Sequence, residues 1–154
     1  MRLWQSLYLA IWVVFLEFLL SMIPFWQPLL IYLHAVLGLI IVCIAYYNFA
    51  ALRATTVPGR LKRIASATFS MSILLAILGP LIFFNIGTGW PLFGGITVWN
   101  AILFIHVVTA FGVITQIAAT ALGYDMWEEK EFLEETLPGK IPPNPAQMRT
   151  KPTP

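Results

Sequence analysis

Hydrophobic residues along this chain gather in four long stretches, which polar or basic connectors separate. The stretches cover approximately residues 3–23, 29–53, 64–84 and 96–122. A helix needs roughly 20 apolar residues, at about 1.5 Å per residue, to cross a hydrocarbon layer about 30 Å thick. Each stretch meets this length. The sequence therefore predicts an all-α, integral membrane four-helix up-down bundle over residues 1–123.

Composition supports a lipid environment. Of the 154 residues, 59% are hydrophobic and only 10% are charged, which is more apolar surface than a soluble domain of this length can bury. The chain contains no phosphate-binding loop, nucleophile elbow or nucleic-acid-binding module. We therefore expect a multi-pass protein of the cell membrane with no nucleic-acid partner.

Basic residues predict the orientation of the bundle. They cluster on one side of the predicted membrane, and the two opposite loops contain none: Arg2, Arg53, Arg60, Lys62 and Arg63. Because cytoplasmic loops carry an excess of Lys and Arg, both termini are predicted to be cytoplasmic. Residues 124–154 form a tail that is first acidic and then rich in proline, predicted as a short surface helix followed by extended chain. This tail is interpreted either as a solvated segment or as a docking segment for a partner subunit.

Few strongly polar residues interrupt the four spans, and each requires a partner or a function because burial in hydrocarbon is costly. The chain has only two histidines, His34 in the second span and His106 in the fourth. Both are predicted to lie in the outer half of the membrane, as is Glu17 near the end of the first span. Gln116 shares a helical stripe with His106. Glu17 and Gln116 are therefore candidate proton-accepting or hydrogen-bonding groups.

The two histidines form a candidate haem site. In an up-down bundle the second and fourth helices lie on a diagonal, so their imidazoles would face each other across the axis. A haem iron takes two axial nitrogens from opposite sides, and Gly38 and Gly112 would leave room for the ring. No Cys-x-x-Cys-His motif is present, which predicts non-covalent attachment. The sequence thus predicts one bis-histidine haem b, with His34 and His106 as axial ligands.

Two sequence pieces carry a resemblance to a known family. Leu-His-Ala-Val-Leu-Gly (residues 33–38) and Ile-His-Val-Val (residues 105–108) resemble the ligand segments of transmembrane b-type cytochromes, especially one four-helix half of the haem A synthase family. That family places one histidine near the start of the second helix of each half and another in the fourth, which implies axial ligation for His34 and His106. The family's Glu-x-x-His-Arg signature is absent, since Ile31 and Ala35 occupy the flanking positions. The resemblance therefore implies haem binding rather than haem A synthesis.

These features predict an electron-transfer subunit of a respiratory or quinol-oxidising complex rather than a stand-alone enzyme. One haem in one leaflet cannot carry electrons across the whole membrane. The expected partners are therefore other membrane subunits, a quinone or an extracytoplasmic electron carrier. The alternatives are a non-catalytic structural subunit, a haem-modifying enzyme related to haem A synthase, a copper site with Glu17 as third ligand, and a chlorophyll-type ring.

Overall fold

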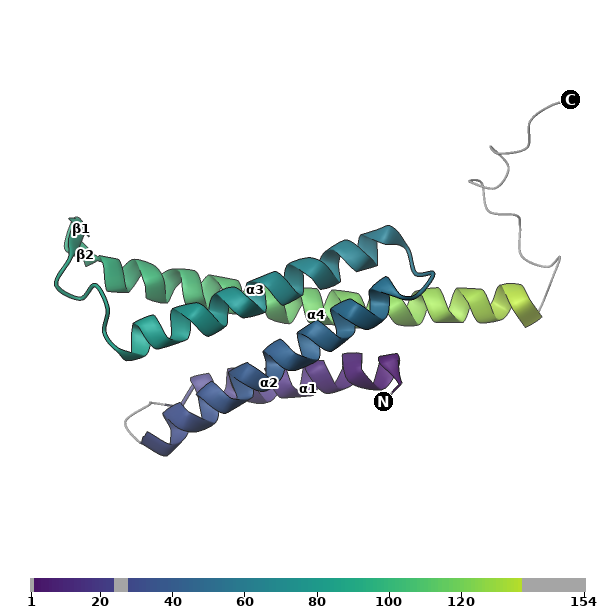
Figure 1. Ribbon diagram of the computed structural model, residues 1–154, viewed down its shortest axis with the longest axis horizontal. Helices are drawn as coiled ribbons and strands as arrows, with labels where there is room; N and C mark the ends of the chain where they lie inside the picture. Colours follow the sequence, from purple (N-terminus) through teal and green to yellow (C-terminus); the bar gives the residue numbers. More distant parts are fainter. Residues whose placement is uncertain (1, 24–27, 137–154) are drawn as a thin grey trace, which may run out of the picture.

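The computed structural model describes residues 2–23 and 28–136, which form four long helices and one small hairpin (Figure 1). The elements in chain order are α1 (Leu3–Ser21), α2 (Pro28–Arg53), α3 (Gly59–Phe83), β1 (Pro91–Phe93), β2 (Ile96–Thr97) and α4 (Val98–Thr136). The predicted turn between the first two helices and the proline-rich end of the tail lie at residues 24–27 and 137–154, outside the described residues.

The helices form an antiparallel bundle. Helix α1 packs against α2 and α4, and α3 packs against the same two helices, so α2 and α4 lie on a diagonal. All four are long and apolar enough to cross a membrane. The prediction of an all-α bundle is confirmed. We call the end that carries β1 and β2 the hairpin end, and the end that carries the α2–α3 connector the basic end.

Helix α4 continues well beyond the point where the sequence predicted its end. It runs without interruption through residue 122 to Thr136, so the separate surface helix expected in the tail is part of α4. Its 39 residues make it about 58 Å long, and Figure 1 shows its last turns extending past the other three helices. Glu and Lys residues in these turns favour helix, and no proline interrupts them. The Tyr8 hydroxyl of α1 donates a hydrogen bond to Asp125 at the start of this extension.

A tight hairpin closes the glycine-rich connection between α3 and α4. Strands β1 and β2 are antiparallel, and Phe93 pairs with Ile96 across a two-residue turn. Gly94 and Gly95 form this turn with φ angles of 57° and 81°, a conformation that residues with a Cβ rarely adopt. The indole N–H of Trp99 donates a 3.2 Å hydrogen bond to the carbonyl of Ile82, which joins the start of α4 to the end of α3.

Apolar packing is concentrated at the basic end and in the middle of the bundle. The basic-end cluster comprises Leu7, Leu52, Val57, Leu61, Ala65, Ala121 and Tyr124. The middle cluster comprises Ala10, Val14, Ile41, Val113 and Ile117. Toward the hairpin end, the α1–α2 pair diverges from the α3–α4 pair (Figure 1). The two histidines and Glu17 lie in this diverging part.

Candidate haem-binding site

The imidazoles of His34 and His106 face each other across the bundle. Their ring centroids lie 6.4 Å apart, and the ring planes are inclined by 50°. His34 follows the start of α2 by six residues and His106 follows the start of α4 by eight, so both lie about 10 Å along their helices from the hairpin end. The predicted juxtaposition of these two residues is therefore present, and it depends on the diagonal placement of α2 and α4.

Glu17 of α1 completes the group. Its Oε1 atom lies 2.7 Å from Nδ1 of His34, and its side chain is only 14% exposed. Histidines that bind metals commonly place their second ring nitrogen against a carboxylate, which orients the ring and raises its basicity. Because the carboxylate lies at Nδ1, a metal bound by His34 would be held through Nε2. A carboxylate at this depth also requires a partner of this kind, because an isolated charge in hydrocarbon is costly.

Two buried polar atoms at the site have no hydrogen-bond partner among the described residues. They are Oε2 of Glu17 and Nδ1 of His106. Buried polar groups are nearly always paired, and an exception calls for an explanation such as an absent ligand or water. The site therefore contains two polar atoms that can still form a hydrogen bond or bind a ligand.

Gly38 and Gly112, which the sequence predicts to make room for a ring, and Gly79 of α3 have different neighbours. A Cβ at Gly38 would stand 3.9 Å from Oε1 of Glu17, and one at Gly79 would stand 3.9 Å from Cε1 of His106. At Gly112 it would stand 2.5 Å from the terminal methyl of Met71. Gly38 thus lies beside the carboxylate and Gly79 beside the imidazole, each with room for a Cβ, whereas Gly112 accommodates Met71. That Gly38 and Gly112 clear space for a ring stays a prediction.

Gln116 does not join the histidines. It lies ten residues beyond His106 on α4, which corresponds to about 15 Å along the helix. Its side-chain oxygen is 3.0 Å from the Thr68 hydroxyl, and its Nε2 is 3.2 Å from the sulfur of Met71. Gln116 therefore connects α4 to α3 in the basic half of the bundle.

The spacing of the two imidazoles suits one iron ion. With a metal–nitrogen bond of about 2 Å, two imidazoles bound on opposite sides of a metal have ring centroids about 6 Å apart. The observed 6.4 Å matches this separation. Over residues 2–23 and 28–136, no group of three His, Cys, Asp or Glu side chains could hold a metal ion. A copper site with Glu17 as the third ligand therefore finds no support among these residues.

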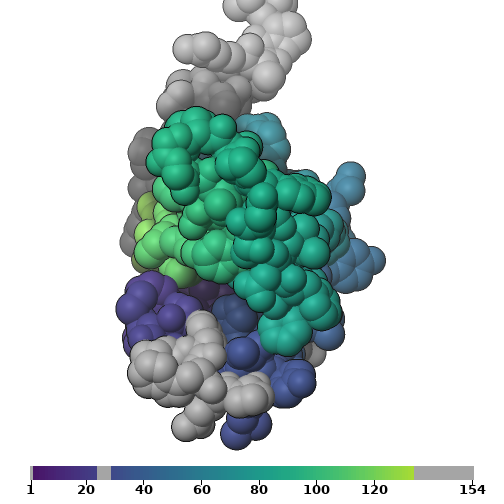
Figure 2. Space-filling view, turned by 90° about the vertical axis from the view of Figure 1, so that its left-hand side faces the viewer, coloured from purple at the N-terminus to yellow at the C-terminus, as the bar shows by residue number. Residues whose placement is uncertain are grey.

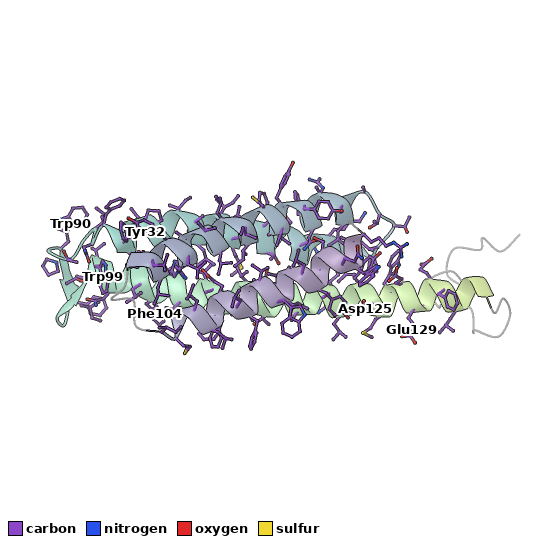
Figure 3. All side chains as sticks on the ribbon, turned by 90° about the horizontal axis from the view of Figure 1, so that it is seen from below. Tyr32, Trp90, Trp99, Phe104, Asp125 and Glu129 are labelled. Atoms are coloured by element: carbon purple, nitrogen blue, oxygen red, sulfur yellow. The ribbon has the colours of Figure 1, made fainter. Side chains whose placement is uncertain are left out.

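Aromatic residues mark the hairpin end of the bundle, where the site lies. Figure 2 looks onto this end, with α1 and α2 in purple and blue on one side and α3, the hairpin and α4 in teal and green on the other. Figure 3 places Tyr32, Trp90, Trp99 and Phe104 here, while Asp125 and Glu129 lie toward the other end. Tyr32, Trp90 and Phe104 are each more than 60% exposed, so they lie on the outside of the bundle rather than between the two histidines.

Sequence reasoning identified both histidines and Glu17, but not that Glu17 contacts His34. It also missed a small cavity beside Asn48 in the basic half of the bundle, although the position of Asn48 on the inward stripe of α2 was a signal for it. No protein-family model, curated protein or solved structure matches this chain.

Proposed function

We propose that this chain is a haem-b-binding electron-transfer subunit of a membrane complex, with His34 and His106 as the two axial ligands. The observation that supports this proposal best is the 6.4 Å separation of two imidazoles that come from diagonal helices. These are the only histidines of the chain. When bound, haem supplies reversible one-electron chemistry at its iron.

Each residue of the site has a distinct role in this proposal. His34 and His106 offer one ring nitrogen each along the α2–α4 diagonal. Glu17 orients His34 through the 2.7 Å contact with Nδ1. Gly79 lies beside Cε1 of His106, and Thr109, buried one turn further along α4, keeps that segment against the bundle interior.

The proposed setting is the cell membrane, with both termini in the cytoplasm. Arg53, Arg60, Lys62 and Arg63 lie at the basic end, and the described connector between α3 and α4 carries no charge. This asymmetry favours a cytoplasmic basic end. The site would then lie near the outer face, where a quinone, an extracytoplasmic electron carrier or another subunit of a respiratory or quinol-oxidising complex can exchange electrons with it.

The experiment that tests the proposal is a reduced-minus-oxidised absorption spectrum of the detergent-purified chain, expressed with added haem precursor, together with a pyridine haemochrome assay. We expect sharp b-type bands and a stoichiometry near one haem per chain. A colourless protein after haem supplementation would overturn the proposal. Mass analysis of the extracted haem distinguishes a carrier, which holds unmodified haem b, from a haem-modifying enzyme.

A non-catalytic scaffold is the second candidate, and the Glu17–His34 contact favours it. This contact joins α1 to α2, and polar contacts of this kind hold membrane helices together. A ring separation of 6.4 Å also falls within the range of ordinary aromatic packing, about 4.5 to 7 Å. The scaffold predicts no bound chromophore and a loss of helix association when Glu17 is replaced, whereas the cytochrome predicts loss of haem.

A further inference from the structure

Three aromatic rings and one arginine form a continuous row across α2 and α3. The rings of Phe49 on α2 and Phe69 on α3 are stacked, with centroids 5.6 Å apart and planes inclined by 14°. Tyr46, one turn before Phe49, has its ring centroid 5.3 Å from that of Phe69. At the other end, the guanidinium carbon of Arg53 lies 5.2 Å from the centroid of Phe49, a cation–π contact. We call these four residues the α2–α3 row.

The row lies on the outside of the bundle and starts at its basic end. Arg53 is the last residue of α2 and is exposed, as is Tyr46, while the rings of Phe49 and Phe69 are half-buried. Tyr46 precedes Arg53 by seven residues, which corresponds to about 10 Å along the helix. If the helices cross a hydrocarbon layer about 30 Å thick, the row extends from the membrane surface through much of one leaflet. A lipid beside it would place its headgroup at Arg53 and its acyl chains along the rings.

The guanidinium of Arg53 is not neutralised within the chain. Among residues 2–23 and 28–136, no carboxylate forms an ion pair with it. A guanidinium has five N–H donors in a planar fork, and this geometry matches the oxygens of a phosphate group. Arg53 can therefore bind an anionic group from outside the chain while its planar face stays on the Phe49 ring.

Lys62 adds a second positive charge beside the end of α2. Its ammonium group donates hydrogen bonds to the carbonyls of Thr55, at 2.7 Å, and Arg53, at 3.3 Å. An ammonium has three N–H donors, so one remains for another acceptor. Lys62 precedes Phe69 by seven residues on α3, which places the two residues on the same face of that helix. The basic end of the row thus carries two cations, one of which the backbone holds in place.

Charge and position together select the ligand. Basic pockets between membrane helices bind anionic lipid headgroups, whereas a zwitterionic headgroup brings a cation of its own toward the two positive charges. We propose that the α2–α3 row binds one anionic phospholipid, with its phosphate at Arg53 and Lys62 and one acyl chain along the three rings. This inference shares the membrane setting of the proposed function but does not depend on haem binding.

Native mass spectrometry of the full chain in a mild detergent tests this site. The chain is titrated with phosphatidylglycerol and, separately, with phosphatidylcholine of the same acyl chains, and the dissociation constant of the first bound lipid is compared. We expect phosphatidylglycerol to bind at least about fivefold more tightly, because the loss of a favourable contact between one cation and an anionic headgroup has an effect of this size. Equal binding of the two lipids would overturn the proposal.

Arg53→Gln should weaken the binding of phosphatidylglycerol about fivefold and leave that of phosphatidylcholine unchanged. Arg63→Gln is the matched control, since it removes the same charge from an exposed residue that lies about 100° around α3 from Lys62. We expect this control to change the affinity less than about twofold, because Arg63 lies outside the row. Equal weakening by the two substitutions would indicate diffuse attraction to the basic end and would overturn the proposal.

Competition with inorganic phosphate separates a lipid site from a site for a free anion. A lipid held by its headgroup and an acyl chain should remain bound when phosphate is added at the concentration of the lipid. Displacement under these conditions would show that the anionic group alone accounts for binding, which would also overturn the proposal.

Discussion

The carboxylate of Glu17 on α1 lies 2.7 Å from Nδ1 of His34 on α2, although the connection between these helices places the two residues seventeen positions apart. This contact joins the only acidic residue of the first span to one of the two histidines. A metal bound by His34 would therefore be held through Nε2 rather than Nδ1. The contact and the histidine pair together define the candidate site.

Replacing Glu17 should weaken haem binding through His34. We expect Glu17→Leu to lower haem affinity about 10- to 100-fold, the usual effect of losing a carboxylate behind a metal-binding histidine. Glu17→Gln keeps an oxygen at the same position and should lose less. Haem titration of the purified apoprotein measures both. Glu128→Gln, on the exposed extension of α4, is the matched control. Unchanged affinity in Glu17→Leu would mean that the carboxylate does not position His34.

Replacing either histidine should abolish haem binding. His34→Ala and His106→Ala each remove one of two axial nitrogens, and b-type attachment has no covalent bond to compensate. We expect no haem to copurify, while circular dichroism shows unchanged helical content. Adding free imidazole should restore part of the binding, because it can fill the space of the missing ring. Either variant retaining full haem with an unchanged spectrum would contradict the paired-ligand assignment.

The size of residue 79 should control the position of His106. A Cβ at Gly79 would make only an ordinary 3.9 Å contact with Cε1 of His106, so Gly79→Ala should bind haem normally. Gly79→Leu would extend into the imidazole and should lower haem affinity at least tenfold. Gly89→Leu is the control, since a Cβ there meets nothing within 4 Å. Normal binding by Gly79→Leu would show that His106 is not confined by α3.

The contact between Thr68 and Gln116 should stabilise the packing of α3 against α4. Polar contacts between membrane helices contribute about 0.6 kcal/mol on average in double-mutant cycles. We expect a coupling near this value between Thr68→Val and Gln116→Leu, measured by reversible unfolding in mixed micelles. Thr115→Val should be neutral, because the Thr115 hydroxyl donates to the Phe111 carbonyl of its own helix and Thr115 is exposed. Strictly additive effects of the two substitutions would rule out the coupling.

The sequence by itself determined the four helices, because the length of an uninterrupted apolar stretch is set by residue type alone. It also identified His34, His106 and Glu17, because ionisable groups are rare in such stretches and stand out without any knowledge of packing. The sequence did not predict the end of α4 correctly. Hydropathy marks where a helix leaves the hydrocarbon layer, and the backbone hydrogen bonding of the helix can continue beyond that point.

Only the tertiary structure decided which of these side chains meet. Membrane helices are apolar on nearly every face, so hydrophobic periodicity specifies neither their rotation nor their register. The contact of Glu17 with His34, the separation of Gln116 from the histidines and the packing of Gly112 against Met71 all depend on that register. The cavity at Asn48 arises for the same reason, because residues from four helices must reach one level of the bundle to enclose it.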